Sequence, residues 1–279
     1  MKVSLIQMDI VWLDAAANRM AAERLMRSAE KSDIYVLPEM WNTGVTTEPQ
    51  GILEIKNEKL KSKNEEGSQT LLWMQAMADE LDAAVAGSVA VHLQDGTYRN
   101  RLYFVKPQTP SNSPSKGRNQ ESLPKEGEVW KGSFYDKHHL FSYGGETENY
   151  TPGNERVTVE WRGVRFRLSV CYDLRFPLWL RNKDDYDVLI CVASWPTVRT
   201  HAWQVLLQAR AIENQCYVLG VNRIGKDPVC EYSGSTCVVD PFGFATFCPE
   251  GEASVVTQTL DLKRLKAFRE KFPVLKEAD

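Results

Sequence analysis

Apolar residues along the chain fall into short continuous runs and into longer stretches with a period near four. The short runs predict strands at 2–9, 33–38, 84–91, 100–106, 156–161, 164–170, 187–193, 216–222, 235–239, 244–248 and 254–260. The longer stretches predict helices at 14–31, 68–82, 176–183, 198–214 and 261–270. The helices form an early and a late group. This order indicates strands in the middle of the fold and helices on both outsides.

Several of the predicted strands are apolar at every position, as in Val188-Leu189-Ile190-Cys191-Val192-Ala193. Such strands are buried on both faces or pack against a second sheet. The pattern therefore predicts an α/β fold. Because the composition does not shift enough to divide the chain, we expect residues 1–279 to form a single domain, with a C-terminal arm at about 261–279.

Residues 107–128 differ from the rest of the chain. They are rich in Pro, Ser, Asn, Lys and Glu and contain few apolar residues. This composition predicts a polar surface insertion. Since long loops are often functional, the alternative is a lid over the site.

Composition places the chain among ordinary globular proteins. Of its 279 residues, 43% are hydrophobic and 25% charged, and the formal net charge is −3. A negative net charge is not typical of a nucleic-acid-binding protein, so we do not expect a nucleic acid as partner. No apolar run approaches the roughly 18 residues of a membrane span. The N-terminus becomes polar too soon for a signal peptide and is predicted to be the first strand.

The cysteines bear on both compartment and metal binding. Six are present, at positions 171, 191, 216, 230, 237 and 248. None forms a Cys-x-x-Cys pair, and the histidines do not have the spacing of a zinc site. We therefore expect a reduced, cytoplasmic protein.

Three reactive side chains each follow an apolar strand. Cys171 follows Leu168-Ser169-Val170, Glu39 follows Tyr35-Val36-Leu37-Pro38, and Lys137 follows Phe134-Tyr135-Asp136. A strand end can hold a nucleophile rigidly in a cleft. Together the three provide what a thiol needs to hydrolyse an amide: a base in Glu39, and in Lys137 both an oxyanion donor and a charge favouring the thiolate. The backbone N–H of Tyr172 is the predicted second oxyanion donor.

A cysteine–histidine hydrolase is the alternative mechanism. It would require His92, His138, His139 or His201 as the base. None of these follows a strand in the way that Glu39 does. The sequence therefore favours the glutamate as base.

The motifs that contain these residues resemble the three signatures of the nitrilase superfamily of carbon–nitrogen hydrolases. They are Leu37-Pro38-Glu39, Tyr135-Asp136-Lys137-His138-His139-Leu140-Phe141 and Cys171-Tyr172-Asp173-Leu174-Arg175-Phe176-Pro177. The resemblance extends over nearly the whole chain. It implies a four-layer α-β-β-α sandwich and no metal or organic cofactor. It also implies a second glutamate seven residues before a glycine, which is Glu146 before Gly153, with Glu148 as a rival.

Within the superfamily, the form Cys-Tyr-Asp-x-Arg-Phe-Pro, with Ala193-Ser194-Trp195-Pro196 downstream, is most similar to the ω-amidase group. This resemblance implies hydrolysis of the terminal amide of 2-oxoglutaramate and 2-oxosuccinamate through a thioester. Two alternatives remain open within enzymes, a carbamoyl hydrolase and an amidase of a deaminated peptide. A third is a catalytically idle binding or scaffold protein, against which the intact Glu39, Lys137 and Cys171 argue.

Such a substrate carries a carboxylate, and a buried carboxylate requires a cation. Arg175, four residues after Cys171, is the first candidate, although it could instead make a structural ion pair. Arg199 and Arg210 rank lower, and Glu213 is within reach of Arg210 on a helix. Trp195 and Trp41 are the candidate walls of the pocket.

Apolar residues of the late helix and the tail predict association between copies. The helix at 198–214 carries Trp203, Leu206 and Leu207, and the tail contains Phe272-Pro273-Val274-Leu275. This is more apolar surface than the outer layer of a monomer needs. We therefore expect at least a homodimer, which the family resemblance also implies.

Overall fold

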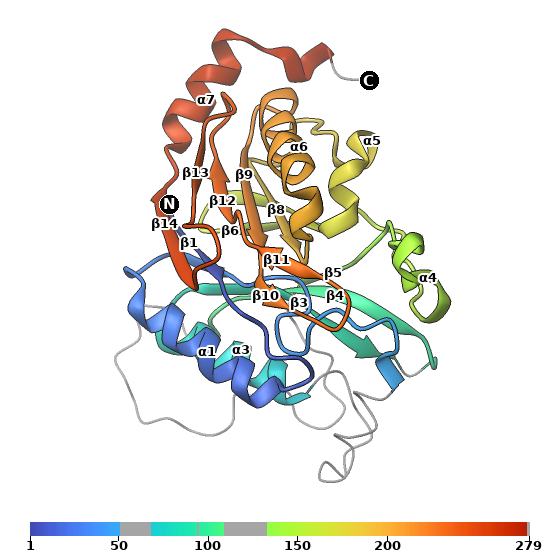
Figure 1. Ribbon diagram of the computed structural model, residues 1–279. Coiled ribbons are helices and arrows are strands. Elements are labelled where there is room, and N and C mark those ends of the chain that lie inside the picture. Colours follow the sequence, from blue (N-terminus) through green and yellow to red (C-terminus); the bar gives the residue numbers. More distant parts are fainter. Residues whose placement is uncertain (51–67, 94, 109–132, 278–279) are drawn as a thin grey trace.

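The computed structural model describes residues 1–50, 68–93, 95–108 and 133–277, and within them two six-stranded sheets lie face to face (Figure 1). The first sheet has the order β14-β1-β2-β3-β4-β5. Its strands are β1 (Lys2–Gln7), β2 (Ile34–Val36), β3 (Ala84–His92), β4 (Tyr98–Val105), β5 (Ser133–Asp136) and β14 (Ser254–Thr259). β1, β2 and β3 are parallel to one another, and the remaining pairings are antiparallel.

The second sheet has the order β13-β12-β9-β8-β7-β6. Its strands are β6 (Thr158–Trp161), β7 (Val164–Val170), β8 (Val188–Ala193), β9 (Tyr217–Asn222), β12 (Cys237–Val239) and β13 (Ala245–Phe247). The central strands β7, β8 and β9 are parallel. A separate hairpin of β10 (Ile224–Lys226) and β11 (Glu231–Ser233) was not predicted, because each of these three-residue strands includes a charged residue and contains no apolar run.

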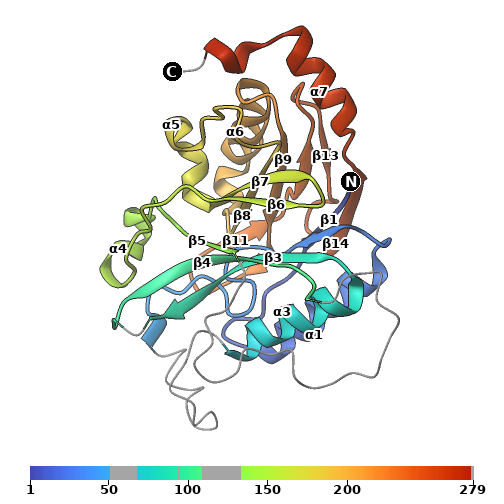
Figure 2. The ribbon, with the colours of Figure 1, turned by 180° about the vertical axis from the view of Figure 1, so that it is seen from behind.

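Helices cover the outer face of each sheet (Figures 1 and 2). α1 (Ala15–Ser28) and α3 (Ser68–Leu81) pack on the first sheet, and α5 (Pro177–Leu180) and α6 (Thr200–Glu213) pack on the second. α7 (Leu262–Lys271) follows β14. One apolar cluster lies between the two sheets, and one lies beneath each helical layer. The predicted four-layer α-β-β-α sandwich is therefore confirmed.

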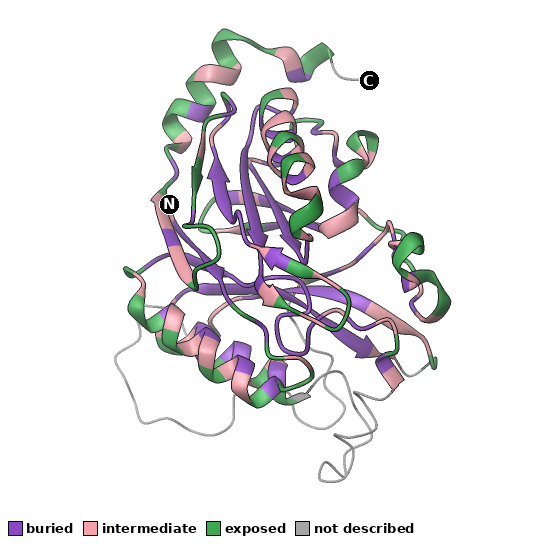
Figure 3. Cartoon of the chain, in the orientation of Figure 1, coloured by how far each residue is buried: buried purple, intermediate pink, exposed green. Residues whose placement is uncertain are grey.

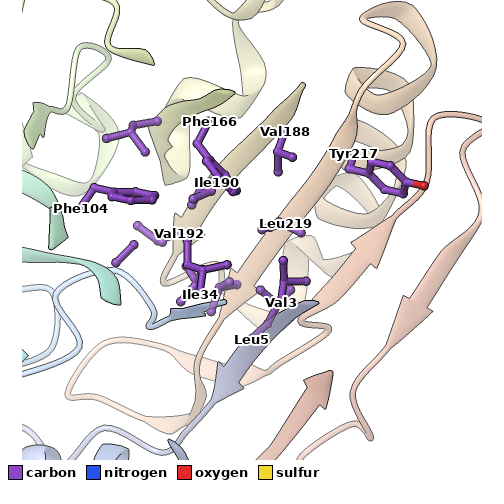
Figure 4. Packing of buried hydrophobic residues seen from close by; sticks show 14 of the residues in the cluster. Val3, Leu5, Ile34, Phe104, Phe166, Val188, Ile190, Val192, Tyr217 and Leu219 are labelled. Carbon is purple, nitrogen blue, oxygen red and sulfur yellow. The ribbon is translucent and has the colours of Figure 1, made fainter. Parts of the chain in front are cut away.

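Strand β8 shows why its sequence is apolar throughout. Val188, Ile190 and Val192 point into the cluster between the sheets (Figure 4), whereas Leu189, Cys191 and Ala193 belong to the cluster beneath α5 and α6. Successive side chains of a strand point to opposite faces, so a strand in the middle of four layers needs apolar residues at every position. Figure 3 shows the same division across the molecule, with buried strands and helices exposed on their outer sides.

Two predictions about the late helices need correction. Of the helix predicted at 176–183, only the four residues of α5 are helical; α5 begins at Pro177, just after the 3₁₀ helix η2 (Cys171–Arg175). On α6, Trp203 and Leu207 are fully buried against the second sheet. They provide no surface for a second copy, because an amphipathic helix hides its apolar side in its own core. The dimer stays a prediction, for which Phe272 of the tail remains as an exposed apolar residue.

The predicted insertion at 107–128 lies outside the described residues, apart from Pro107 and Gln108. Whether it is a surface loop or a lid therefore stays open. Among the described helices, none is long and apolar enough to cross a membrane.

Candidate active site

Four segments of the chain meet where strands of the two sheets end. Glu39 lies in the turn after β2, and Lys137 directly follows β5 in the first sheet. From the second sheet, Cys171 directly follows β7 and Ser194 directly follows β8. The fold thus places side chains that are more than 150 residues apart in sequence at one position, as the hydrogen bond between Ser194 and Glu39 shows.

Lys137 is at the centre of this cluster. Its Nζ donates to Oε1 of Glu39 at 3.0 Å and to Oε2 of Glu146 at 2.7 Å. All three side chains are at most 4% exposed. Burial by itself lowers the pKa of a lysine, but the two carboxylates outweigh it and hold the pKa of Lys137 well above its ordinary value. The lysine is therefore a fixed positive charge.

Asn100, a residue that sequence reasoning missed, joins the two glutamates. It lies on β4, is 1% exposed, and its Nδ2 donates to Oε1 of Glu39 at 2.8 Å and to Oε1 of Glu146 at 3.2 Å. One amide thus fixes both carboxylates relative to Lys137. The available signal was a buried polar residue in an apolar strand, which requires a specific partner.

The remaining oxygen of Glu39 is held from the second sheet. The backbone N–H of Ser194 donates to its Oε2 at 2.8 Å, and the Ser194 hydroxyl donates to the Glu39 backbone carbonyl at 3.3 Å. The motif residues Ser194-Trp195 therefore orient the candidate base. A carboxylate with both oxygens engaged is held in one rotamer, which is the preorganisation that proton transfer requires.

Glu146 owes its position to a tight loop. It is the first residue of α4 (Glu146–Asn149), and its Oε2 also accepts the Phe141 backbone N–H at 2.7 Å. Gly153 ends the segment, where its N–H donates to the Lys137 carbonyl at 3.0 Å. A Cβ on Gly153 would lie 2.3 Å from the Asp136 carbonyl oxygen, so only glycine allows this approach. The rival Glu148 is exposed.

The backbone at Cys171 is strained. Its φ of +46° lies in the left-handed region, which costs a non-glycine residue about 1–3 kcal/mol. Such a conformation marks the sharp strand-to-helix turn on which a nucleophile is presented. As a residue Cys171 is half-buried, as is Cys230, whereas Cys191, Cys216, Cys237 and Cys248 are buried.

Asp173 holds this turn in place. The fully buried carboxylate accepts the Val170 N–H at 3.0 Å, the Tyr135 hydroxyl at 2.7 Å, and both the backbone N–H and Nδ1 of His139, at 2.8 and 2.9 Å. These bonds tie the segment of Cys171 to the segment that follows Lys137. Sequence reasoning gave Asp173 no role, because three of its four hydrogen bonds come from Tyr135 and His139, in and just after β5 of the other sheet.

The histidines have structural partners. His138 stacks on Trp179 with ring centroids 3.7 Å apart, His139 stacks on Phe176 at 3.6 Å, and His92 stacks on Tyr98 at 4.5 Å. His201 is exposed on α6. None of the hydrogen bonds seen in the described chain joins a histidine to Cys171, so the geometry favours the glutamate as base.

The pKa of Cys171 contradicts the prediction that the charge of Lys137 favours a thiolate. Burial, and then the Glu39 carboxylate, raise the pKa of the Cys171 thiol well above its ordinary value, and Lys137 only partly opposes them. The ammonium of Lys137, which is bonded to two carboxylates, does not offset the effects of burial and Glu39 on the thiol. The resting nucleophile is therefore a neutral thiol, and its proton has to move to Glu39 as it attacks.

This charge state predicts how alkylation depends on pH. With the pKa of Cys171 raised, the thiol stays protonated at neutral pH, so the rate of alkylation by iodoacetamide should climb through pH 9 without levelling off. The rate is measured by mass spectrometry of the Cys171 peptide, with the Cys230 peptide as the internal reference. A rate that is already constant below pH 7 would show a thiolate and contradict this assignment.

The residues considered for substrate binding differ in burial: Arg175 lies at the surface, whereas Arg210 and Trp41 are buried. Arg175 is exposed, with its guanidinium 5.0 Å from the centre of the Trp195 ring. Arg210 is buried and bonds Glu213 at 3.0 Å and the Leu174 carbonyl at 2.7 Å, as its helical spacing indicated. Trp41 is fully buried in the cluster beneath α1 and α3, so it is a core residue and not a pocket wall.

Several aromatic side chains lie beside the reactive cluster. The Tyr172 ring meets Phe141 and Phe176 edge-on at 5.1 and 5.2 Å. Trp195 is 3% exposed, and its indole N–H donates to the Arg199 carbonyl at 2.8 Å. A glutamate base, a fixed ammonium and a thiol, with aromatic rings beside them, can carry out acyl transfer from an amide to sulfur.

Comparison with known proteins agrees with this chemistry. Residues 2–270 match the carbon–nitrogen hydrolase family model. The chain belongs to the carbon–nitrogen hydrolase family. It is therefore an enzyme that hydrolyses amide carbon–nitrogen bonds, as its motifs predicted, and not an idle scaffold on this fold.

Relatives and solved structures of this family align with the whole chain. The omega-amidase YafV of Escherichia coli is 38% identical over 100% of this chain and 97% of its own length. The 2-oxoglutaramate amidase of Bacillus subtilis is 32% identical over 98% and 95%. The crystal structure of XC1258 from Xanthomonas campestris, described as a CN-hydrolase superfamily protein with an arsenic adduct in its active site, has a TM-score of 0.83 at 34% identity, and the match covers 100% of this chain and 97% of that one.

Proposed function

We propose that this hydrolase is an ω-amidase that releases ammonia from the terminal amide of short 2-oxo dicarboxylate monoamides such as 2-oxoglutaramate and 2-oxosuccinamate. The observation that carries the proposal is the buried Lys137, bonded to both Glu39 and Glu146 at the strand end beside Cys171. The relatives named for ω-amidase and 2-oxoglutaramate amidase activity support the choice of substrate class.

In the first half-reaction, Cys171 Sγ attacks the amide carbon while Glu39 takes the thiol proton. The Lys137 ammonium and the Tyr172 backbone N–H stabilise the oxyanion of the tetrahedral intermediate. Glu39 then passes its proton to the leaving nitrogen. The C–N bond breaks, ammonia departs, and the acyl group stays on sulfur as a thioester.

In the second half-reaction, Glu39 takes a proton from water, which attacks the thioester carbon. The C–S bond breaks, the acid is released, and the thiol regains its proton. Glu146 and Asn100 act on this chemistry by holding Lys137 and Glu39 in place through both halves.

Arg175 is the proposed partner of the substrate carboxylate. Its guanidinium is exposed over Trp195 and has no ion pair within the described residues, so its N–H groups are available to an anion. The alternative that it makes a structural ion pair has no support in this part of the chain. Trp195, which directly follows Ser194, provides the wall on which the guanidinium rests.

We expect Arg175→Met to lower kcat/KM for 2-oxoglutaramate at least about tenfold, in line with the loss of a charged hydrogen bond. The kcat/KM for the uncharged analogue 4-oxopentanamide, in which a methyl group replaces the carboxylate, should fall much less, because the amide end of the substrate binds elsewhere. Ammonia release measures both. An equal loss for the two amides would make Arg175 structural. A wild-type enzyme that prefers neutral amides or carbamoyl compounds would contradict the ω-amidase proposal itself.

A further inference from the structure

Arg199 is a second cation near the reactive cluster. It ends the 3₁₀ helix η3 (Thr197–Arg199), five residues after the Ser194 that orients Glu39. Its guanidinium lies over the Phe141 ring, 5.5 Å from the ring centre. Sequence reasoning ranked it below Arg175, which lies four residues after Cys171.

Phe141 connects Arg199 to the reactive groups. The Phe141 backbone N–H donates to Glu146 at 2.7 Å, and its ring contacts Tyr172, the residue directly after Cys171, at 5.1 Å. Arg199 therefore reaches from the end of the second sheet to the loop that follows β5. Its guanidinium lies over a ring that borders both the nucleophile segment and the glutamate that holds Lys137.

Trp195 connects Arg199 to Arg175. The indole N–H of Trp195 donates to the Arg199 carbonyl at 2.8 Å, and the Arg175 guanidinium lies over the same indole at 5.0 Å. The two arginines thus share one buried tryptophan, although they come from separate loops. A guanidinium that rests on an aromatic ring keeps its in-plane N–H groups free for hydrogen bonds.

The charge of the reactive cluster makes these two cations significant. Glu39 and Glu146 contribute two negative charges and Lys137 one positive charge, so with a neutral thiol the cluster has one net negative charge. The Asp173 carboxylate adds another close by. An anionic substrate is repelled by this field unless cations compensate for it. Like Arg175, Arg199 has no ion pair within the described residues that would neutralise it.

We propose that Arg199 is a second specificity-determining residue, which together with Arg175 binds the 2-oxo acid end of the substrate. This inference rests on the proposed ω-amidase function. A 2-oxo acid presents two carboxylate oxygens and an adjacent ketone oxygen. One guanidinium can bind the carboxylate through two parallel hydrogen bonds, which leaves the second to bind the ketone oxygen and the nearer carboxylate oxygen.

Three amides separate these contacts. 2-Oxoglutaramate has the carboxylate and the ketone, glutaramate lacks the ketone, and 4-oxopentanamide lacks the carboxylate. Each is assayed by ammonia release with the wild type and with Arg199→Gln, Arg199→Lys and Arg175→Met. The matched control is Arg264→Gln, which removes an exposed arginine that lies 4.8 Å over the Phe242 ring in the C-terminal region.

We expect Arg199→Gln to lower the ratio of kcat/KM for 2-oxoglutaramate to that for 4-oxopentanamide at least tenfold, mainly through KM, and Arg199→Lys to restore part of it. Arg264→Gln should leave the ratio unchanged. A double variant that lacks both Arg175 and Arg199 should have a lower kcat/KM for 2-oxoglutaramate than either single variant. Circular dichroism and melting temperature verify that each variant is folded.

Two results would overturn the inference. One is an equal loss on all three amides in a folded Arg199→Gln protein, which would show a structural role. The other is a kcat/KM like that of the wild type on all three amides. Neither would affect the proposed function, which fails separately if wild-type enzyme does not prefer 2-oxoglutaramate to 4-oxopentanamide.

Discussion

Cys171→Ala should lower kcat for 2-oxoglutaramate by at least about 10⁴-fold, because it removes the atom to which the acyl group is transferred. The loss should appear in kcat and not in KM, since the thiol contributes little to ground-state binding. The variant should remain folded. Alanine meets the same left-handed strain as cysteine at a φ of +46°, and the Asp173 hydrogen bonds that hold the turn do not involve the thiol.

The matched control is Cys230→Ala. Cys230 is the other half-buried cysteine, and it lies in the turn between β10 and β11, outside the hydrogen-bonded cluster around Lys137. This variant should retain wild-type turnover and should still be inactivated by iodoacetamide. Turnover by a folded Cys171→Ala protein at more than about a hundredth of the wild-type rate would exclude Cys171 as the nucleophile.

Glu39→Gln is expected to have the second-largest effect, a loss of about 10²–10⁴-fold in kcat, the usual contribution of a general base. The substitution keeps the shape of the side chain and can still accept from Lys137, but it cannot take the thiol proton. Because the raised pKa of Cys171 leaves a neutral thiol, no thiolate is present to compensate for the missing base.

Glu148→Gln is the control for this variant. Glu148 lies on α4 two residues after Glu146, and its side chain is exposed. It should have wild-type kcat and KM. A Glu39→Gln enzyme within about threefold of the wild-type rate would show that another group is the base.

The sequence predicted the layers of the fold because strand β8 must be apolar on both faces to lie between a second sheet and a helix. Likewise, Glu39, Lys137 and Cys171 each stand at the end of an apolar run, which locates them at strand ends without any tertiary information. Features encoded in consecutive residues could therefore be predicted.

Features that depend on distant contacts could not. Asn100 becomes meaningful only when β4 lies beside the turn of Glu39, and Asp173 only when its carboxylate meets Tyr135 and His139 of the other sheet. The error at Trp203 has the same origin. Its burial depends on which face α6 turns to the second sheet, and counting apolar residues does not determine that.

The prediction that Lys137 favours a thiolate at Cys171 was wrong for an energetic reason. A lysine near a cysteine lowers the thiol pKa when its charge is uncompensated. Here the carboxylates of Glu39 and Glu146 compensate for the positive charge of Lys137, and burial penalises the charged thiolate. The sequence showed that the three charges were present but not how close together they lie.

The most direct test of the account is mass spectrometry of the enzyme quenched in acid milliseconds after mixing with 2-oxoglutaramate. We expect one added acyl group per active chain, mapped to the Cys171 peptide, removed by hydroxylamine and absent from Cys171→Ala. We also expect ammonia to appear at least as fast as the acylated enzyme. An acyl group on a different residue, or ammonia release by folded Cys171→Ala at the wild-type rate, would contradict the account.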